Sequence, residues 1–146
     1  MKRLKVKLMP GWQQVPNPDG PPTFFRGDPN EGNPLQISHA EYLAGKIPDP
    51  KESDLIDLSK SQSRNFGEVT KTTSGTCSFG RFGMACFRSQ QFAFSQVWHL
   101  SDGHDFIFAT YICGKVPDQQ ELAEVERIIK ELNLGETERT WWQFWK

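Results

Sequence analysis

Two apolar segments on either side of residues 101–104 constrain the fold more than any other feature of this sequence. Residues 92–100 and 105–113 are rich in aromatic and β-branched side chains, and they flank Ser101-Asp102-Gly103-His104. Asp-Gly at the centre of such a segment favours a type I′ turn, whose twist matches that of the two strands it joins. We therefore predict a β-hairpin in which Trp98 lies opposite Ile107, and His99 lies opposite Phe106.

The second strand of this hairpin is apolar on both of its faces. Residues 106–112 read Phe-Ile-Phe-Ala-Thr-Tyr-Ile, and consecutive side chains of a strand point to opposite faces of the sheet. A strand that is apolar on both faces is typical of a sheet centre that is covered on two sides. The sequence therefore predicts a central strand with a second layer of structure on each face.

Shorter patterns predict the other strands of an antiparallel sheet. Residues 2–8 alternate between apolar and basic side chains, which is the pattern of a half-buried strand. Residues 69–79 and 84–89 form a second predicted pair, joined near Gly80 and Gly83. Short extended pieces are expected at residues 23–26 and 34–37, after a Pro- and Gly-rich segment around Trp12.

Capping patterns predict three helices. Ser38 and Glu41 have capping-box spacing, which predicts a short helix that Gly45 ends. Pro50 at a first helical position predicts a helix over residues 49–65. A last helix is expected between Pro117 and Gly135, because apolar residues recur there at helical spacing: Leu122, Val125, Ile129 and Leu132.

These elements place the chain in the α+β class. We predict an antiparallel β-sheet flanked by helices, forming one domain over residues 1–135. A separate Trp-rich tail follows at residues 136–146. The full length of 146 residues is near the common size of one domain and is long enough to bury a core without disulfides or metals.

The order of the elements resembles the PsbP-like α/β/α sandwich. A first strand leads into Pro10-Gly11-Trp12, and the Gly80/Gly83 hairpin, the strand centred on Trp98 and the strand containing Thr110-Tyr111 follow the two earlier helices. The resemblance covers roughly residues 4–134 and implies a fold. That superfold is shared by the extrinsic PsbP proteins of photosystem II, a Ran-binding nuclear import factor and several bacterial lipoproteins. Its members do unrelated things, so it implies no activity and no site residue.

Charge and hydropathy narrow the classes of partner. Seventeen Lys and Arg against eighteen Asp and Glu leave a formal charge of −1, which disfavours nucleic acid as a partner. The basic start of the chain lacks the apolar run of a signal peptide, and no stretch of about 18 apolar residues could form a transmembrane helix. We expect a soluble, cytoplasmic protein with no integral membrane segment.

The cysteines and histidines predict neither a disulfide framework nor a metal site. Three cysteines are an odd number for a chain without an export signal, which favours reduced thiols. The three histidines are scattered, and neither they nor the cysteines have zinc-ligand spacing. We expect no cofactor, and the sequence identifies no small-molecule substrate.

The segment around Asp102 and His104 is the candidate for catalysis. A histidine there could serve Cys86 or Cys113 as the nucleophile of a small hydrolase. The same residues are also what a solvated hairpin turn requires for backbone reasons alone. We favour the turn interpretation and predict no catalytic residue.

The segment Thr140-Trp141-Trp142-Gln143-Phe144-Trp145-Lys146 is the one feature that the fold does not explain. Each of its four large aromatic side chains could bury roughly 150–250 Å². The tail could pack on its own domain, dock on a protein partner or a second copy, or sit at a membrane interface. The candidate partner-binding residues are Trp12, Trp141, Trp142, Phe144 and Trp145.

We interpret the chain as a non-enzymatic protein-binding or interaction domain. It would act through an exposed sheet face, the Pro-rich segment around Trp12 or the aromatic tail. The alternatives are the small hydrolase that uses the Asp102/His104 turn, and an inhibitor or immunity-type protein that neutralises one cognate partner.

Overall fold

The structure is a computed structural model that describes residues 2–136. Nine strands and two helices follow one another along the described chain. In chain order they are β1 (Lys2–Lys5), β2 (Trp12–Val15), β3 (Thr23–Arg26), β4 (Leu35–Ala40), α1 (Glu52–Arg64), β5 (Glu68–Thr76), β6 (Arg81–Arg88), β7 (Phe94–Ser101), β8 (Phe106–Cys113), α2 (Gln119–Lys130) and β9 (Asn133–Glu136).

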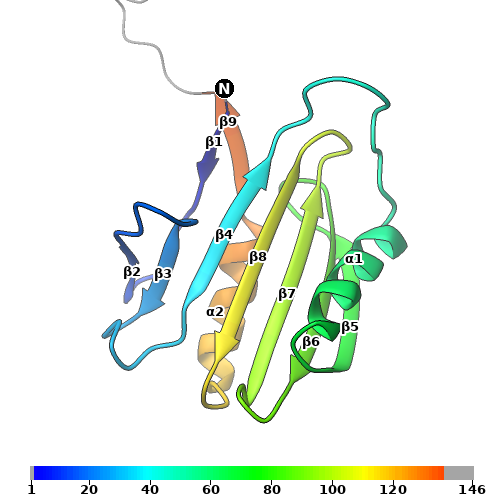
Figure 1. Cartoon of the computed structure of the whole chain (residues 1–146). Coiled ribbons are helices and arrows are strands. Elements are labelled where there is room, and N and C mark those ends of the chain that lie inside the picture. Colours follow the sequence, from blue (N-terminus) through cyan, green and yellow to red (C-terminus); the bar gives the residue numbers. More distant parts are fainter. Residues whose placement is uncertain (1, 137–146) are drawn as a thin grey trace, which may run out of the picture.

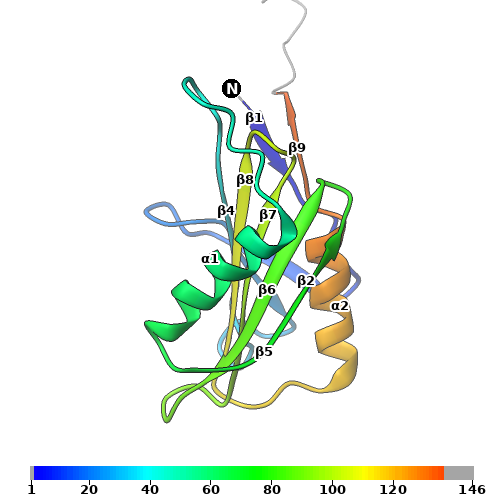
Figure 2. The same cartoon turned by 90° about the vertical axis from the view of Figure 1, so that its right-hand side faces the viewer.

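An antiparallel sheet of seven strands forms the middle layer, in the order β2-β3-β4-β8-β7-β6-β5. Helix α2 lies behind this sheet in Figure 1, and α1 lies in front of it. The edge-on view in Figure 2 shows the two helices on opposite sides of the sheet. Strands β1 and β9 form a separate two-stranded sheet. The predicted α+β fold class, an antiparallel sheet flanked by helices, is confirmed.

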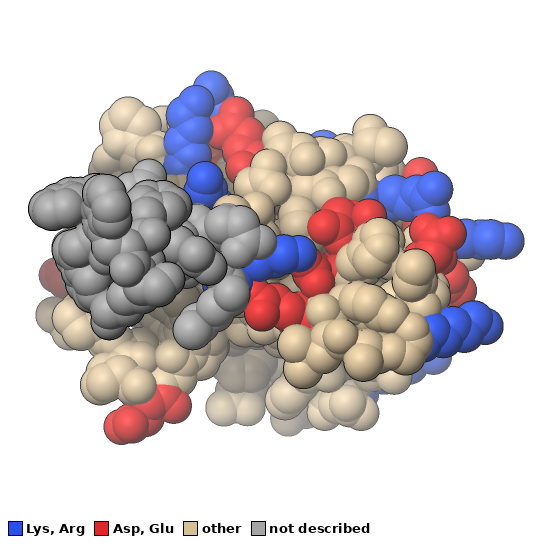
Figure 3. Space-filling view, turned by 90° about the horizontal axis from the view of Figure 1, so that it is seen from above, with Lys and Arg blue, Asp and Glu red and all other residues tan. Residues whose placement is uncertain are grey.

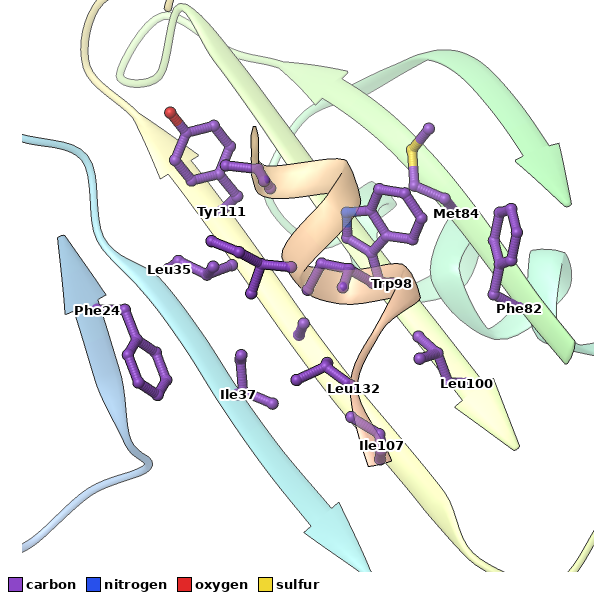
Figure 4. Close-up of a cluster of buried hydrophobic side chains, with 14 of the residues drawn as sticks. Phe24, Leu35, Ile37, Phe82, Met84, Trp98, Leu100, Ile107, Tyr111 and Leu132 are labelled. Carbon is purple, nitrogen blue, oxygen red and sulfur yellow. The ribbon is translucent and has the colours of Figure 1, made fainter. Parts of the chain in front are cut away.

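The core lies between α2 and the back of the sheet (Figure 4). Val125, Ile128 and Ile129 of α2 are fully buried there, as the apolar stripe of this helix predicted. They face the side chains that the sheet strands direct to the same side, which include Phe24, Leu35, Ile37, Phe82, Met84, Trp98, Leu100, Ile107 and Tyr111. Trp98 is 1% exposed, so the largest side chain of the hairpin is at the centre of this core.

The predicted hairpin is confirmed, but its predicted register is wrong by two residues. Trp98 lies opposite Ala109, and His99 lies opposite Phe108. The last pair is Ser101 with Phe106, so the loop has four residues instead of the two of a type I′ turn. Because side chains alternate with a period of two, this slip leaves every residue on its expected face.

Hydrogen bonds to the side chain of Asp102 explain the longer loop. Its Oδ1 accepts the backbone N–H groups of His104 at 2.9 Å and Asp105 at 2.8 Å. The hydroxyl of Ser101 donates to the carbonyl of Asp105 at 2.8 Å. These bonds satisfy the loop backbone locally, and Gly103 supplies the residue with positive φ, at +100°.

The helix predicted to begin at Ser38 is wrong. Ser38 lies in β4, which pairs with β8 over six residues up to Ala40, and this ladder outweighs the local capping signal. The carboxylate of Glu41 accepts the backbone N–H of Lys2 instead of capping a helix. The helix predicted over residues 49–65 is confirmed as α1, but it begins at Glu52, so Pro50 precedes the helix instead of taking its first position. At its start Asp54 accepts the N–H of Lys51 at 2.9 Å.

The last predicted helix is confirmed, but it is shorter than expected. Asp118 caps α2 by accepting the N–H of Glu121 at 2.7 Å. The helix ends at Lys130, and Gly135 lies in β9, where it pairs with Arg3 of β1. Strand β9 was not predicted, because four residues give too little periodicity to be recognised. Its partner β1 is correspondingly shorter than the predicted strand at residues 2–8.

Candidate functional site

One half of the front sheet face is less deeply covered than the other. Helix α1 packs against β5, β6 and β7, whereas β4 and β8 run beside it in Figure 1. Ala40 is exposed on this side, and the other side chains that β4 and β8 direct to it are half-buried: Gln36, Ser38, Phe106, Phe108, Thr110 and Ile112. We call these six residues the open face. The predicted layer on each side of the central strand is therefore complete only behind it.

The position of α1 is set by a close approach to β6. A Cβ atom on Gly83 would collide with backbone atoms of Leu55 and Ile56, so only glycine lets the helix backbone lie this near. Ser59 strengthens the contact, because its hydroxyl donates to the Gly83 carbonyl at 3.0 Å. The helix is thereby held over β6 and β7, to one side of the open face.

His99 forms the border between α1 and the open face. The single proton of the Ser59 hydroxyl goes to Gly83, so Ser59 accepts from Nδ1–H of His99 at 2.8 Å. The imidazole ring lies 4.9 Å from the ring of Phe108. Burial lowers the pKa of His99 to about 4, so the imidazole is neutral at physiological pH.

This Ser–His pair has the residue types of a nucleophile and its base, but not the accessibility. Ser59 is 0% exposed, and it faces the sheet from beneath α1. A hydroxyl in that place cannot reach a substrate, and its proton is already donated to a backbone carbonyl. The pair therefore fixes α1 on the sheet.

The Asp102/His104 turn holds a different set of contacts from those of a hydrolase. Asp102 uses Oδ1 to bind the loop backbone, and His104 is exposed, with its ring 5.8 Å from that of Tyr42. Cys113 lies at the opposite end of β8 from this turn. Burial raises the pKa of the Cys113 thiol to about 12 and also raises that of Cys86, so neither thiol ionises readily.

A cavity of about 460 Å³ lies at the end of the open face where β8 leaves the sheet. Ile112 belongs to both the open face and the cavity lining. The lining is apolar at Pro34, Phe92, Ile112, Val116 and Pro117, and it is charged at Glu31, Lys115, Asp118 and Glu121. Three acidic groups against one basic group give this cavity a net negative lining.

Two neighbouring side chains hold the carboxylate of Glu121 in the lining of the cavity. Its Oε2 accepts the hydroxyl of Tyr111 and the side-chain N–H of Asn33, the latter at 3.2 Å. Burial raises the pKa of Tyr111, so the phenol stays protonated and serves as a donor. A carboxylate held in this way, with apolar walls around it, suits a cationic group carried on an apolar body.

The structure places Trp12 in the core. Its side chain is 7% exposed, and its indole N–H donates to Oε1 of Glu124 at 3.3 Å. The same oxygen pairs with Nε of Arg26 at 2.9 Å, which explains how Glu124 is accommodated at 9% exposure. A partner could contact this indole only if the segment opened, and Trp12 has a structural role.

The other four candidate residues, Trp141, Trp142, Phe144 and Trp145, lie outside the described residues. The sequence suggested an exposed sheet face as a binding surface, but it did not identify the residues of the open face or the cavity. The sequence did carry one sign of an incompletely covered face. Residues 106–112 are apolar on both faces, whereas α2 has a strong apolar stripe and α1 has a weaker one.

Charge is mixed over the end of the molecule where β9 terminates. Figure 3, which looks down on the end where β9 terminates, shows acidic and basic side chains interspersed among other residues. Among residues 2–136, no group of three His, Cys, Asp or Glu side chains could hold a metal ion. In the same part of the chain, no helix is long and apolar enough to cross a bilayer.

Comparisons by sequence find no matching family model and no matching curated protein. Comparisons by structure find several similar proteins. LpqN of Mycobacterium tuberculosis, described as involved in cell envelope biogenesis, is 11% identical with a TM-score of 0.59, over 93% of this chain and 85% of that one. CyanoP, the cyanobacterial PsbP of Synechocystis sp. PCC 6803, is 11% identical with a TM-score of 0.53, over 90% and 92%.

Another is a protein of Bacteroides thetaiotaomicron. It is 12% identical with a TM-score of 0.50, over 94% of this chain and 47% of that one. Likeness at this level of identity shows the fold alone. The resemblance inferred from the order of the elements is thereby confirmed, and the chain has a PsbP-like α+β fold.

Proposed function

We propose that this chain is a protein-binding domain that has no chemistry of its own and uses the open face and the adjoining cavity to hold its partner. The observation that carries the proposal is the central strand β8. Phe106, Phe108 and Ile112 are only half-buried on it, although large apolar side chains at a sheet centre are normally covered.

The polar members of the open face support binding to a protein chain. Gln36, Ser38 and Thr110 alternate with the apolar side chains and can form hydrogen bonds without carrying charge. Interface cores are depleted in charge and enriched in aromatic residues. The negative cavity at one end adds a place for a lysine or arginine side chain of the partner.

A photo-cross-linking amino acid at Thr110 tests this proposal. The matched control carries the same group at Ser61, an exposed position on α1. We expect a discrete adduct of higher mass in extracts of the source cells from position 110 and none from position 61. Equal background from the two positions, with no discrete adduct, would contradict the proposal.

A cytoplasmic location remains our prediction from the sequence. One protein of similar fold is described as involved in cell envelope biogenesis, so fractionation should compare the cytoplasm with the envelope. Recovery in the envelope fraction would show that the location predicted here is wrong, and the cross-linking would then be repeated on envelope extracts.

A further inference from the structure

We propose that the Trp-rich tail, residues 137–146, binds the open face of its own domain and so competes with the partner. This inference rests on the proposed function, because it takes the open face to be a binding surface. It names the first occupant of that surface. The argument uses the point where the tail begins, its length, its composition and its charge.

The tail begins at the end of the sheet where the open face starts, but on the side that α2 covers (Figure 2), so it has to cross to the other side of the sheet. Glu136, the last described residue, pairs with Lys2 across the β1–β9 ladder. The backbone N–H of Lys2 donates to Glu41, and its ammonium pairs with Asp105. Ala40 and Phe106 form the last pair of the β4–β8 ladder. Glu41 directly follows Ala40, and Asp105 directly precedes Phe106.

The tail has the length that this surface requires. From Phe106 to Ile112 the open face extends six residues along β8, or about 20 Å at about 3.3 Å per residue. Ten residues after Glu136 reach at most about 33–36 Å when fully extended. About 13–16 Å therefore remain for crossing from β9 to the start of the face.

The composition of the tail matches the surface. Trp141, Trp142, Phe144 and Trp145 fall in the second half of the tail, which would lie over Phe108 and Ile112 rather than over the crossing. Aromatic pairs stabilise a contact beyond what the burial of their area contributes. Thr140 and Gln143 can pair with the polar members of the open face.

Charge favours the same direction of binding. A tail that runs from Phe106 towards Ile112 brings Lys146 to the cavity with the net negative lining. There Glu121, held by Tyr111 and Asn33, suits an ammonium group on an apolar stem. Direction, length and charge thus agree on one placement.

Disulfide trapping in the full chain tests this placement. Cys77 is half-buried and free, so it is first replaced by serine, whereas Cys86 and Cys113 are buried behind the sheet and stay. Thr110→Cys is combined with Gln143→Cys. Thr72→Cys with Gln143→Cys is the matched control, because Thr72 is exposed on the edge strand β5.

We expect mild oxidation to give an intrachain bridge at monomer mass, formed faster at position 110 than at position 72. Equal rates at the two positions would show an undirected tail and would overturn the inference. A bridge at dimer mass would overturn it as well, and would identify the tail of a second copy as the occupant. If trapping fails while cross-linking from position 110 still captures a partner, this inference fails and the proposed function stands.

Tryptophan fluorescence of the reduced full chain provides a second measurement that needs no cysteine. Thr110→Lys places a charge in the middle of the open face, and Thr72→Lys places the same charge on β5. We expect Thr110→Lys, but not Thr72→Lys, to shift the emission to longer wavelength, because only Thr110→Lys releases the tail tryptophans to water. Unchanged emission in a Thr110→Lys variant that unfolds at the temperature of Thr72→Lys would overturn the inference.

Discussion

Gly83→Ala tests whether the contact between α1 and β6 fixes the helix in place. The new methyl group would lie 2.8 Å from Cβ of Leu55 and closer still to backbone atoms of Leu55 and Ile56. Backbone cannot turn away as a flexible side chain does, so α1 has to move. Overpacking of this kind costs about 1–3 kcal/mol.

The displacement also weakens two hydrogen bonds of Ser59, to the Gly83 carbonyl at 3.0 Å and from His99 at 2.8 Å. Each bond contributes about 1 kcal/mol to stability. The combined loss is about 3 kcal/mol, which lowers the melting temperature of a domain of this size by about 6–12 °C.

Thermal and urea unfolding, followed by circular dichroism, measure this loss. The control is Gly114→Ala, because an added Cβ there meets nothing within 4 Å and the site is exposed. We expect the control to unfold like the wild type. A Gly83→Ala variant as stable as the control would refute the argument that the close approach holds α1 to one side of the open face.

Three further predictions test the site and its surroundings. The pKa of His99 is lowered from 6.5 to about 4 in the folded state, so the unfolded chain binds more protons between these values. Wild-type stability should therefore fall by about 2–3 kcal/mol from pH 6.5 to pH 4, and His99→Gln should lose less over this range in urea titrations. Asp105→Asn should cost about 1–2 kcal/mol in urea unfolding at neutral pH, because the buried carboxylate pairs with Lys2; equal stability would contradict this role. Ile107→Ala should cost about 2–5 kcal/mol, and Phe108→Ala should cost less, because only Ile107 is fully buried; the reverse order would show that the open face is the more tightly packed side of β8.

The sequence predicted those elements in which local and long-range signals agree. The stripe of α2 and the apolar strands of the hairpin are recognisable alone and are buried together in the structure. The helix expected after Ser38 was wrong because its capping box is a local signal, while β4 gains a six-residue ladder with β8. The register was wrong because Asp102 binds the loop backbone, and this makes a longer loop favourable.

The candidate site could not be predicted in the same way, because it arises where α1 does not extend across the sheet to cover β4 and β8. No single residue of the open face is unusual for a strand. What exposes Phe106 and Phe108 is that α1 is held on β6 and β7 by Gly83. Such an arrangement depends on the lateral position of a helix across a sheet, and the periodicity of one segment carries no information about it.

The two parts of the sequence that remained unexplained therefore have one physical account. The strand at residues 106–112 is apolar on a side that α1 leaves half-covered, and the tail carries four aromatic side chains beyond the end of β9. Each alone would leave apolar surface in contact with water, which favours association. Because Lys2 joins β9 to the ends of β4 and β8, the tail starts at the end of the sheet where the open face begins, on the side that α2 covers. A partner that binds the open face would then compete with a segment of the same chain, which is present at high effective concentration. A lysine introduced into the tail would remove only this competitor, so it should raise the measured affinity of the partner. Thr110→Lys would instead damage the open face itself.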